Sequence, residues 1–413
     1  METKMAEGTI TVPKGFFAGG LYCGLKGSRK NDIGILVCPA GAKAVGMFTT
    51  NKIVSPAVIV SRRHCESAKI YAVIANSGNA NACTGKQGYK NAIKMCSATA
   101  KSLSKTGFLQ SECKSKNVLI ASTGIIGQQL PMQKISSGIK KLAGKISDTK
   151  KAGVNFAKAI LTTDTKTKQA VRKINISEKQ ITIAGTAKGA GMIAPNMATT
   201  LSFFTTDAKI SKQLLRAAFK DAIGMSLNKL TVDGHQSTND TAIILASGAA
   251  GNKNINKRKS PAYRKFRNAL CQLCDELAKQ MTLDAEGATR IFKVIIKKSA
   301  TRTDAGKAAR AIADYPLVKC AVNGGDPNWG RIICAVGSAG VKLKPDKLTC
   351  KLDNLTVFRN GKPVKFDTKK AERIVSAKEH TITVSLGAGK YSDYCYGCDL
   401  SRDYVRINAD YHT

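Results

Sequence analysis

The stretch Lys188–Asp207, KGAGMIAPNMATTLSFFTTD, is the segment around which we interpret the rest of the chain. Gly189 and Gly191 permit backbone torsions and close approaches that a side chain would block, and Pro195 biases the residue before it toward an extended backbone. The run that follows is rich in apolar and β-branched residues, which predicts a mostly buried strand. The residues alone therefore indicate a glycine turn that leads into a core strand, with a pair of threonines at its start.

The size and composition of the chain are those of a globular protein. Its 413 residues can bury a large core, and 43% of them are hydrophobic while 23% are charged. No stretch approaches the roughly 20 consecutive apolar residues that a membrane span needs. The N-terminal sequence METKMAEGTITVPKGF lacks the apolar segment of a secretory signal. We therefore expect a cytoplasmic protein that does not enter the membrane.

The formal net charge of +38 is extreme and favours nonspecific attraction to polyanions. The basic residues are dense in one place only, which comprises Lys253, Lys257, Arg258, Lys259, Arg264, Lys265 and Arg267. No aromatic residues are interleaved with them as stacking platforms, and no nucleic-acid-binding motif is found. We therefore expect no specific nucleic-acid partner, and keep a basic nucleic-acid-binding protein as an alternative.

Thirteen cysteines are spread along the chain, and an odd number without an export signal favours reduced thiols over a disulfide framework. Two CxxC pairs, Cys271/Cys274 and Cys395/Cys398, could in principle form a four-cysteine zinc site. The first pair lies in a segment with helical periodicity, where residues three apart share one buried face. We therefore predict ordinary thiols and no metal site.

Strand-like and helix-like segments alternate irregularly along the chain, which predicts a layered α/β (α+β) fold and not a repeat array. Short β-like runs are expected at 9–12, 34–38, 44–50, 56–61 and 70–75, and further strands at 116–122, 242–248 and 291–297. Helices are expected at 88–103, twice between 131 and 159, and at 209–230, 263–280 and 303–313.

Two polar loops follow predicted strands. The asparagine-rich stretch 76–85, NSGNANACTG, could satisfy backbone groups with its amides or could line a site, and the sequence leaves both open. Thr123 and Gly124 follow the strand KNVLIAS, and a hydroxyl beside a backbone N–H at a strand end suits the stabilisation of an oxyanion. A common Thr-Gly turn is the alternative.

The sequence contains no familiar base for nucleophilic catalysis. Its four histidines, His64, His235, His380 and His412, lie in no nucleophile or metal motif, and no phosphate-binding glycine loop is found. One remaining solution is a threonine whose own free α-amine acts as the base, which requires cleavage of the chain immediately before it. The glycine and proline residues ahead of Thr199 are where a strained, cleavable peptide could lie.

The stretch KGAGMIAPNMATTLSFFTTDA resembles the signature of the ArgJ family, the glutamate N-acetyltransferases also called ornithine acetyltransferases. Further blocks resemble the family in the same order, namely PKGFFAGGLYCGLK, VGMFTTNKI, NSGNANACTG, ASTGIIGQQLPM, AILTTDT, TVDG, STNDT, DAEGATR, GGDPNWGRI and RINADYHT. The resemblance spans residues 9–413. It implies an ornithine acetyltransferase-like (DmpA/ArgJ-like) fold made of self-processed α and β chains.

The resemblance also implies how the chain works. The precursor is expected to cleave itself between Ala198 and Thr199, which gives an α chain, residues 1–198, and a β chain, residues 199–413. Thr199 resembles the nucleophile, with its freed α-amine as the base, and Thr123 and Gly124 resemble the oxyanion-hole pair. In the implied ping-pong cycle Thr199 takes the acetyl group of N²-acetylornithine, ornithine leaves, and glutamate accepts the acetyl group, as in the cyclic route of arginine biosynthesis.

The substrate contacts that the resemblance implies are Thr162 or Thr163, Lys188, Thr199, Glu286, Asn408 and Thr413. No cofactor or metal is implied, and whether acetyl-CoA also serves as a co-substrate stays open. The expected assembly is an α₂β₂ heterotetramer of the two chains. A self-processing amidohydrolase or aminopeptidase, which would send the acyl group to water, is the alternative with the same fold.

Overall fold

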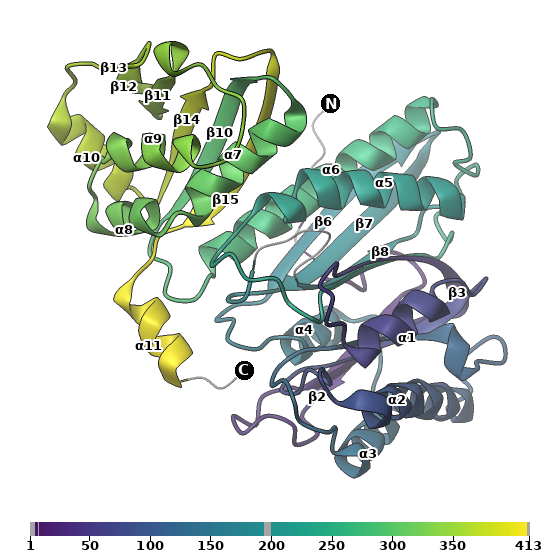
Figure 1. Ribbon diagram of the computed structural model, residues 1–413. Coiled ribbons are helices and arrows are strands. Elements are labelled where there is room, and N and C mark those ends of the chain that lie inside the picture. Colours follow the sequence, from purple (N-terminus) through teal and green to yellow (C-terminus); the bar gives the residue numbers. More distant parts are fainter. Residues whose placement is uncertain (1–4, 7, 194–199, 411–413) are drawn as a thin grey trace.

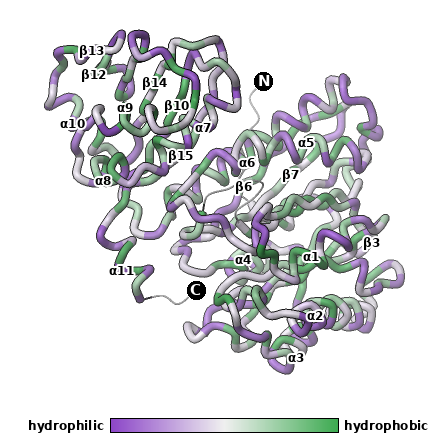
Figure 2. Tube along the Cα trace, viewed as in Figure 1, coloured by the Kyte–Doolittle hydropathy of each residue, from purple (hydrophilic) through white to green (hydrophobic). Residues whose placement is uncertain are grey.

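The computed structural model describes residues 5–6, 8–193 and 200–410. They form two lobes, a larger one that contains a nine-stranded sheet and a smaller one around a six-stranded sheet (Figure 1). The smaller lobe is drawn in green and yellow, because it comes from the last third of the chain. In Figure 2 hydrophobic positions concentrate along the strands, while hydrophilic positions are frequent on outer turns and loops.

The larger sheet runs in the order β1-β6-β7-β8-β9-β3-β4-β5, and β2 pairs with β3 outside this path. Its strands are β1 (Met5–Ala6), β2 (Phe17–Leu21), β3 (Ile33–Phe48), β4 (Ile70–Asn76), β5 (Val118–Ser122), β6 (Lys168–Ile176), β7 (Lys179–Lys188), β8 (Leu201–Thr206) and β9 (Thr241–Ala246). Strand β8 is antiparallel to β7 and parallel to β9.

Strand β3 divides this sheet into two halves that pack on each other. Its first part pairs with β4 and its last part with β9, and the register shifts between Val37 and Ala42. Apolar residues of both halves meet in one core, where Leu36 and Val73 share a cluster with Phe203 and Ile243. The larger lobe therefore has two sheet layers that bury a common face.

Helices cover the two outer faces of these sheet layers (Figure 1). The first group contains α1 (Pro56–His64), α2 (Gly85–Lys105) and α3 (Met132–Ala143), and it packs with β3–β5 in one hydrophobic cluster. On the opposite side α5 (Lys212–Met225) and α6 (Pro261–Leu283) pack with β6–β9 in another. Helix α4 (Lys150–Ala159) contributes Phe156 to the core between the layers. The layered α/β fold predicted from the sequence is confirmed.

Strand β8 is the core strand predicted from the opening stretch. Its six residues are all buried, with Leu201 and Phe203 in the core between the sheets and Phe204 in the cluster beneath α5 and α6. This distribution follows from the alternation of side chains along a strand that is covered on both faces. The prediction of a buried core strand is therefore confirmed for the part of this stretch that the structure describes.

The smaller lobe is built on the order β13-β12-β11-β14-β10-β15. Its strands are β10 (Ile291–Ser299), β11 (Thr349–Leu352), β12 (Leu355–Arg359), β13 (Lys362–Pro363), β14 (Glu379–Ser385) and β15 (Tyr391–Cys398). Its helices are α7 (Arg302–Asp314), α8 (Pro316–Gly324), α9 (Trp329–Gly337) and α10 (Thr368–Ser376). The last element, α11 (Arg402–Asp410), leaves this lobe and buries none of its residues.

Two of the expected strands are wrong. Residues 56–61 begin helix α1, because the Ser55 hydroxyl accepts a hydrogen bond from the Ala57 N–H and Pro56 occupies the first turn. The β-branched residues of this helix are tolerated because Val58 and Val60 are buried. Residues 9–12 form a turn in which the Val12 N–H donates to the Thr9 carbonyl at 3.0 Å.

The predicted boundary between the α and β chains falls inside the larger sheet. Strands β7 and β8 lie on either side of it and pair over six residues, from Ile183–Thr206 to Lys188–Leu201. The division into residues 1–198 and 199–413 therefore stays a prediction about the covalent chain, and it does not coincide with the two lobes. Among the described helices, none is long and apolar enough to cross a membrane.

Candidate active site

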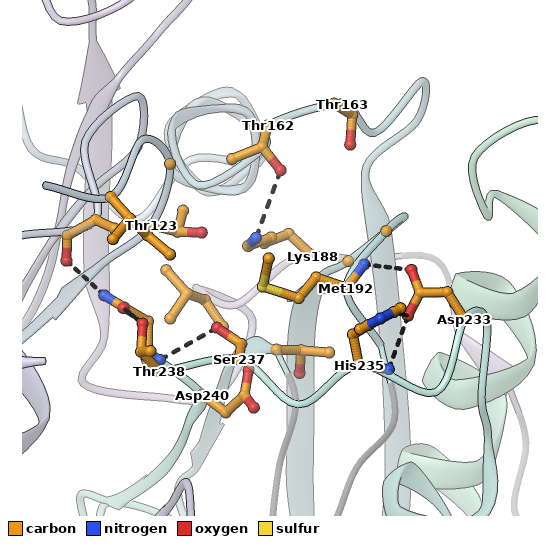
Figure 3. A pocket seen from close by; sticks show the side chains of 18 of the residues that line it. Thr123, Thr162, Thr163, Lys188, Met192, Asp233, His235, Ser237, Thr238 and Asp240 are labelled. Atoms are coloured by element: carbon orange, nitrogen blue, oxygen red, sulfur yellow. Dashed lines mark hydrogen bonds and ion pairs between the residues drawn. The ribbon is translucent and has the colours of Figure 1, made fainter. Parts of the chain in front are cut away.

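A cavity of about 270 Å³ lies at one edge of the larger lobe, where strands from both sheet layers begin or end (Figure 3). The C-terminal ends of β5 and β7 and the N-terminal ends of β8 and β9 reach it. It is lined by Ala80, Thr123, Gly124, Ile126, Thr162, Thr163, Lys188, Gly189, Gly191, Met192, Thr200, Leu201, Asp233, His235, Ser237, Thr238, Asn239, Asp240, Tyr404 and Asn408. Five residues predicted for the site from the sequence thus face one cavity together, with Thr163 as a sixth.

The Thr123–Gly124 turn follows directly from the buried strand β5. Gly124 has a φ of +129°, and a Cβ there would lie 2.4 Å from the Gly78 carbonyl carbon, so only glycine fits. Among the described residues, neither the Thr123 hydroxyl nor the Gly124 N–H has a hydrogen-bond partner. Both donors are therefore available to a ligand in the cavity, as an oxyanion hole requires.

The asparagine-rich loop supports this turn from behind. The Asn76 amide donates to the Asn79 carbonyl at 2.9 Å, and its oxygen accepts from Ser122 at 2.7 Å. The Thr123 N–H donates to the Asn76 carbonyl at 3.0 Å. Of the two interpretations that the sequence left open, the structure shows these amides mainly satisfying backbone and neighbouring polar groups, and Ala80 lining the cavity.

Lys188 ends strand β7 and brings a cation to the cavity. Its Nζ donates to the Thr162 hydroxyl at 3.4 Å, an interaction that Figure 3 also shows. Removal from water lowers the pKa of Lys188, and the carboxylates of Asp164 and Asp240 oppose this effect. A substrate carboxylate would add a further negative charge beside this ammonium group and favour its protonated form.

A buried charge network holds the two loops that carry Thr162 and Lys188. Asp164 accepts the Thr162 N–H at 3.0 Å and the Gly189 N–H at 2.8 Å. Lys168, which is 1% exposed, forms ion pairs with both Asp164 and Asp284. Burial alone would raise the pKa of the Asp164 carboxyl, but Lys168, Lys188 and the Thr162 amide together lower it. The network therefore fixes the geometry of this side of the cavity.

Glu286 lies behind the cavity wall and joins three separate segments. Its carboxylate accepts the Thr163 hydroxyl at 2.5 Å and the Asn408 amide at 2.9 Å. A Cβ on Gly191 would lie 2.1 Å from Glu286 Oε2, so glycine at this position makes room for the carboxylate. The sequence predicted a close approach at Gly191 but did not identify Glu286 as the group that approaches it, because Glu286 is distant in the chain.

The hydroxyls of Thr162 and Thr163 thus have different partners. Thr162 meets Lys188, whereas Thr163 meets Glu286. Both residues line the cavity, so the geometry leaves both as candidates for the substrate contact. Three further predicted site residues, Ala198, Thr199 and Thr413, lie outside the described residues. Their neighbour Thr200 is buried and lines the cavity at the start of β8.

Sequence reasoning missed Asp233, which clamps the chain ahead of the predicted cleavage position. Its carboxylate accepts the Met192 N–H at 2.7 Å and the Ile193 N–H at 2.9 Å, and Met192 has a φ of +53°. The Tyr404 hydroxyl of α11 donates to the same carboxylate at 3.2 Å. Figure 3 shows Asp233 facing Met192 across the cavity rim. In the sequence Asp233 stands only as part of the family-like block TVDG, with no role assigned to it.

Asn239 and Asp240, which lie in the family-like block STNDT, were also missed. The Asn239 amide donates to the Ala80 carbonyl at 2.6 Å and the Ser122 carbonyl at 2.8 Å, which ties this loop to the strand end before Thr123. Asp240 is 3% exposed, and its Oδ2 has no hydrogen-bond partner among the described residues. Burial raises the pKa of this carboxyl well above its usual range, against the attraction of Lys188.

The two CxxC pairs lie on different elements, Cys271 and Cys274 on α6 and Cys395 and Cys398 on β15. All four are free thiols, and burial raises the pKa of each one. Within residues 5–6, 8–193 and 200–410 no group of three or more His, Cys, Asp or Glu side chains could hold a metal ion.

The cavity therefore combines two donors without a partner among the described residues, a lysine, and a carboxylate–threonine–amide cluster. Comparison with known proteins gives this combination a family context. The model of the ArgJ family matches residues 17–413. The chain belongs to the ArgJ family. The resemblance inferred from the sequence blocks is thereby confirmed over nearly the whole chain.

Curated ArgJ relatives match the chain end to end. The bifunctional arginine biosynthesis protein ArgJ of Symbiobacterium thermophilum is 42% identical over 408 residues, which cover 98% of this chain and 99% of that relative. The protein of the same name from Oceanobacillus iheyensis is 40% identical over 410 residues, with 99% and 97% covered. The chain is thus an enzyme of a family whose curated members are named for arginine biosynthesis.

Solved structures of the ArgJ family each match about half of this chain. The ArgJ protein of Bacillus halodurans is 37% identical, with a TM-score of 0.49, and covers 51% of this chain and 98% of its own. An ornithine acetyltransferase of Mycobacterium tuberculosis, solved in complex with ornithine, is 35% identical with a TM-score of 0.44 and covers 48% and 100%.

Proposed function

We propose that the chain is an acetyltransferase that moves the acetyl group of N²-acetylornithine to glutamate through an acetyl ester of Thr199. The observation that carries the proposal is the joint placement of Thr123, Gly124, Thr162, Lys188 and Asn408 around one cavity beside the start of β8. Family membership and the names of the relatives support the reaction class.

Each described group has a role in this reaction. The free donors of Thr123 and Gly124 would stabilise the oxyanion of both tetrahedral intermediates, worth about 3 kcal/mol per donor. Lys188 would bind a substrate carboxylate as a point charge. Glu286, held by Thr163 and Asn408, would receive the amino group of the amino acid. A cavity of about 270 Å³ suits one amino acid at a time, which favours a ping-pong cycle.

The chemistry requires that Thr199 become the N-terminus of a new chain, so that its α-amine can take the hydroxyl proton. We therefore propose self-cleavage between Ala198 and Thr199, with β7 and β8 staying paired across the cut. An α₂β₂ assembly, the substrate contact of Thr413 and action in the cytoplasm are further parts of the proposal that rest on the family resemblance.

Initial rates test the reaction. Glutamate acetylation should give parallel double-reciprocal lines when N²-acetylornithine and glutamate are varied, because ornithine leaves before glutamate binds. Release of acetate at the same rate without glutamate would contradict transfer and support the amidohydrolase alternative.

Intact mass tests the self-cleavage. Freshly purified protein should give two chains that end at Ala198 and begin at Thr199. A Thr199→Ala variant should stay a single inactive chain. A whole wild-type chain that transfers acetyl groups would overturn the proposed nucleophile.

A further inference from the structure

The residues on either side of the proposed cut are held by different means. On the downstream side, the Thr200 carbonyl accepts the Thr241 N–H at 2.8 Å, and Leu201 begins β8 between β7 and β9. On the upstream side, β7 ends at Lys188, so residues 189–193 lie outside the sheet. Their position therefore depends on contacts with other loops.

Asp233 provides the side chain that holds this upstream end. One of its carboxylate oxygens accepts the Met192 N–H at 2.7 Å, and the other accepts the Ile193 N–H at 2.9 Å (Figure 3). The backbone beside it adds a third contact, because the Val232 N–H donates to the Ile193 carbonyl at 2.8 Å. The Asp233 side chain is only 6% exposed, so these hydrogen bonds are shielded from water and are strengthened by it.

Further donors fix the orientation of the Asp233 carboxylate. The His235 N–H donates at 3.1 Å to the oxygen that serves Ile193, and the His235 ring nitrogen Nδ1 lies 3.6 Å from it. The Tyr404 hydroxyl of α11 donates at 3.2 Å to the oxygen that serves Met192. Both oxygens are thus directed by groups from separate parts of the chain, and the carboxylate is preorganised to hold its two amides.

The turn that Asp233 holds is costly for the residue that makes it. Met192 has a φ of +53°, a left-handed conformation in which a side chain clashes with the following carbonyl. Such a conformation persists only where the surrounding contacts impose it. Hydrogen bonds from two successive N–H groups to one carboxylate are charge-assisted and supply this restraint.

We propose that Asp233 is a positioning residue for the self-cleavage. It fixes Ile193, five residues before Ala198, while β8 fixes the chain from Thr200 onward. A short segment with both ends fixed has few conformations to lose, so the two reacting groups meet more often. Asp233 acts through Met192 and Ile193, and the inference rests on the proposed function, whose self-cleavage it deepens.

The cleavage that Asp233 supports balances with water as its co-reactant. The Thr199 hydroxyl oxygen attacks the Ala198 carbonyl carbon, so a C–O bond forms and the C–N bond breaks, while the hydroxyl proton passes to the departing amine. Water then hydrolyses the resulting ester, which leaves a carboxylate on Ala198 and restores the Thr199 hydroxyl.

Asp233→Asn tests the proposal with a substitution of nearly the same shape. It replaces one acceptor oxygen with an NH₂ donor, so either the Met192 or the Ile193 N–H loses its partner. The full-length chain is made by cell-free translation, and intact mass follows the conversion of precursor into two chains with time. We expect cleavage about 100-fold slower than in the wild type, the effect of a misplacement of about 1 Å at the reacting groups.

Asp207→Asn is the matched control. Asp207 is also buried, and its two oxygens accept the Thr182 N–H at 2.8 Å and the Lys14 N–H at 3.3 Å. It follows the end of β8 that lies away from the cavity. We expect its precursor to be cleaved within about twofold of the wild-type rate, because distant sites act independently. Urea titration of both precursors measures any general loss of stability.

A second substitution tests whether Asp233 acts through the turn. Glycine adopts a positive φ without the clash of a side chain, so Met192→Gly should partly replace the restraint that Asp233→Asn removes. We expect the double variant to be cleaved about fivefold faster than Asp233→Asn alone. Equal rates in these two variants would overturn the inference.

Cleavage is timed without any acetyl donor, so the outcomes separate this inference from the proposed acetyl transfer. If the wild type is cleaved and Asp233→Asn is cleaved within about threefold of its rate, the inference is overturned and the proposed function stands. Equal slowing in Asp233→Asn and Asp207→Asn would also overturn it. A wild-type chain that stays whole overturns the self-cleavage and the inference together. If all chains are cleaved at the expected rates but no acetyl group reaches glutamate, the acetyl transfer fails and the inference stands.

Discussion

Replacing Thr123 with valine tests the oxyanion hole most cleanly. Valine has nearly the same shape as threonine, and Thr123 is 8% exposed, so the packing around β5 is preserved. The hydroxyl has no partner among the described residues, and its removal therefore leaves no donor or acceptor unpaired in that part of the chain. We expect the free energy of unfolding to change by no more than about 0.5 kcal/mol.

The catalytic effect should be much larger than the effect on stability. Loss of one preorganised oxyanion donor costs about 3 kcal/mol in the transition state, which is a 10²–10³-fold loss of kcat. The Gly124 N–H stays in place, so some activity should remain above that of Thr199→Ala. Steady-state kinetics on the fully cleaved fraction, isolated by intact mass, measures this effect separately from slow self-cleavage.

Thr123→Ser is the matched control, because it keeps the hydroxyl and loses only a methyl group. We expect its kcat to stay within about tenfold of the wild type. If Thr123→Val retains kcat within about threefold while it folds normally, the hydroxyl does not stabilise the oxyanion. The assignment of the turn would then rest on Gly124 alone.

Three further predictions concern the surroundings of the site and the smaller lobe. Gly191→Ala forces the Glu286 carboxylate away from Thr163 and Asn408, so the KM for the amino-acid substrates should rise about tenfold, which corresponds to about 1.4 kcal/mol of lost binding. Gly224→Ala is the control and should not change this KM, because no atom lies within 4 Å of the added Cβ. Lys168→Met leaves Asp164 and Asp284 buried without their cation, so urea titrations should show a free energy of unfolding lower by about 3–5 kcal/mol. A change below about 1 kcal/mol would show that these ion pairs do not stabilise the fold. Burial lowers the pKa of His380 to about 4, so its stabilising contribution is present above pH 6.5 and is lost as the pH falls toward 4, where the free energy of unfolding should be lower by about 3 kcal/mol. His380→Leu should remove this part of the pH dependence of the free energy of unfolding, and an unchanged dependence in the variant would contradict the prediction.

Sequence reasoning succeeded where the local pattern and the tertiary environment agree. Strand β8 was predicted from its β-branched and aromatic run, and helix α6 from the 3.6-residue period of its apolar positions. Helix α1 was predicted as a strand because Val58, Ile59 and Val60 favour strands locally. The capping hydroxyl of Ser55 and the burial of the helix outweighed that preference.

The site was predicted in part, and the missed residues share one property. Lys188 and Asn408 were named because they matched a known family, block by block, and Thr123 was named first because a hydroxyl at a strand end suits an oxyanion. Asp233 and Asp240 act through contacts with residues about 40 to 50 positions earlier in the chain, such as Met192 and Lys188. Such pairings depend on how β7 and β9 lie in the sheet, which a single sequence does not specify.

The central claim is that Thr199 carries the acetyl group between donor and acceptor. Cleaved enzyme is incubated with N²-acetylornithine and no glutamate, quenched in acid, digested and examined by mass spectrometry. The account predicts one acetyl group on the peptide that begins at Thr199, and its disappearance when glutamate is added before the quench. An unmodified Thr199 peptide under conditions that release ornithine, or an acetyl group that glutamate does not remove, would contradict the account.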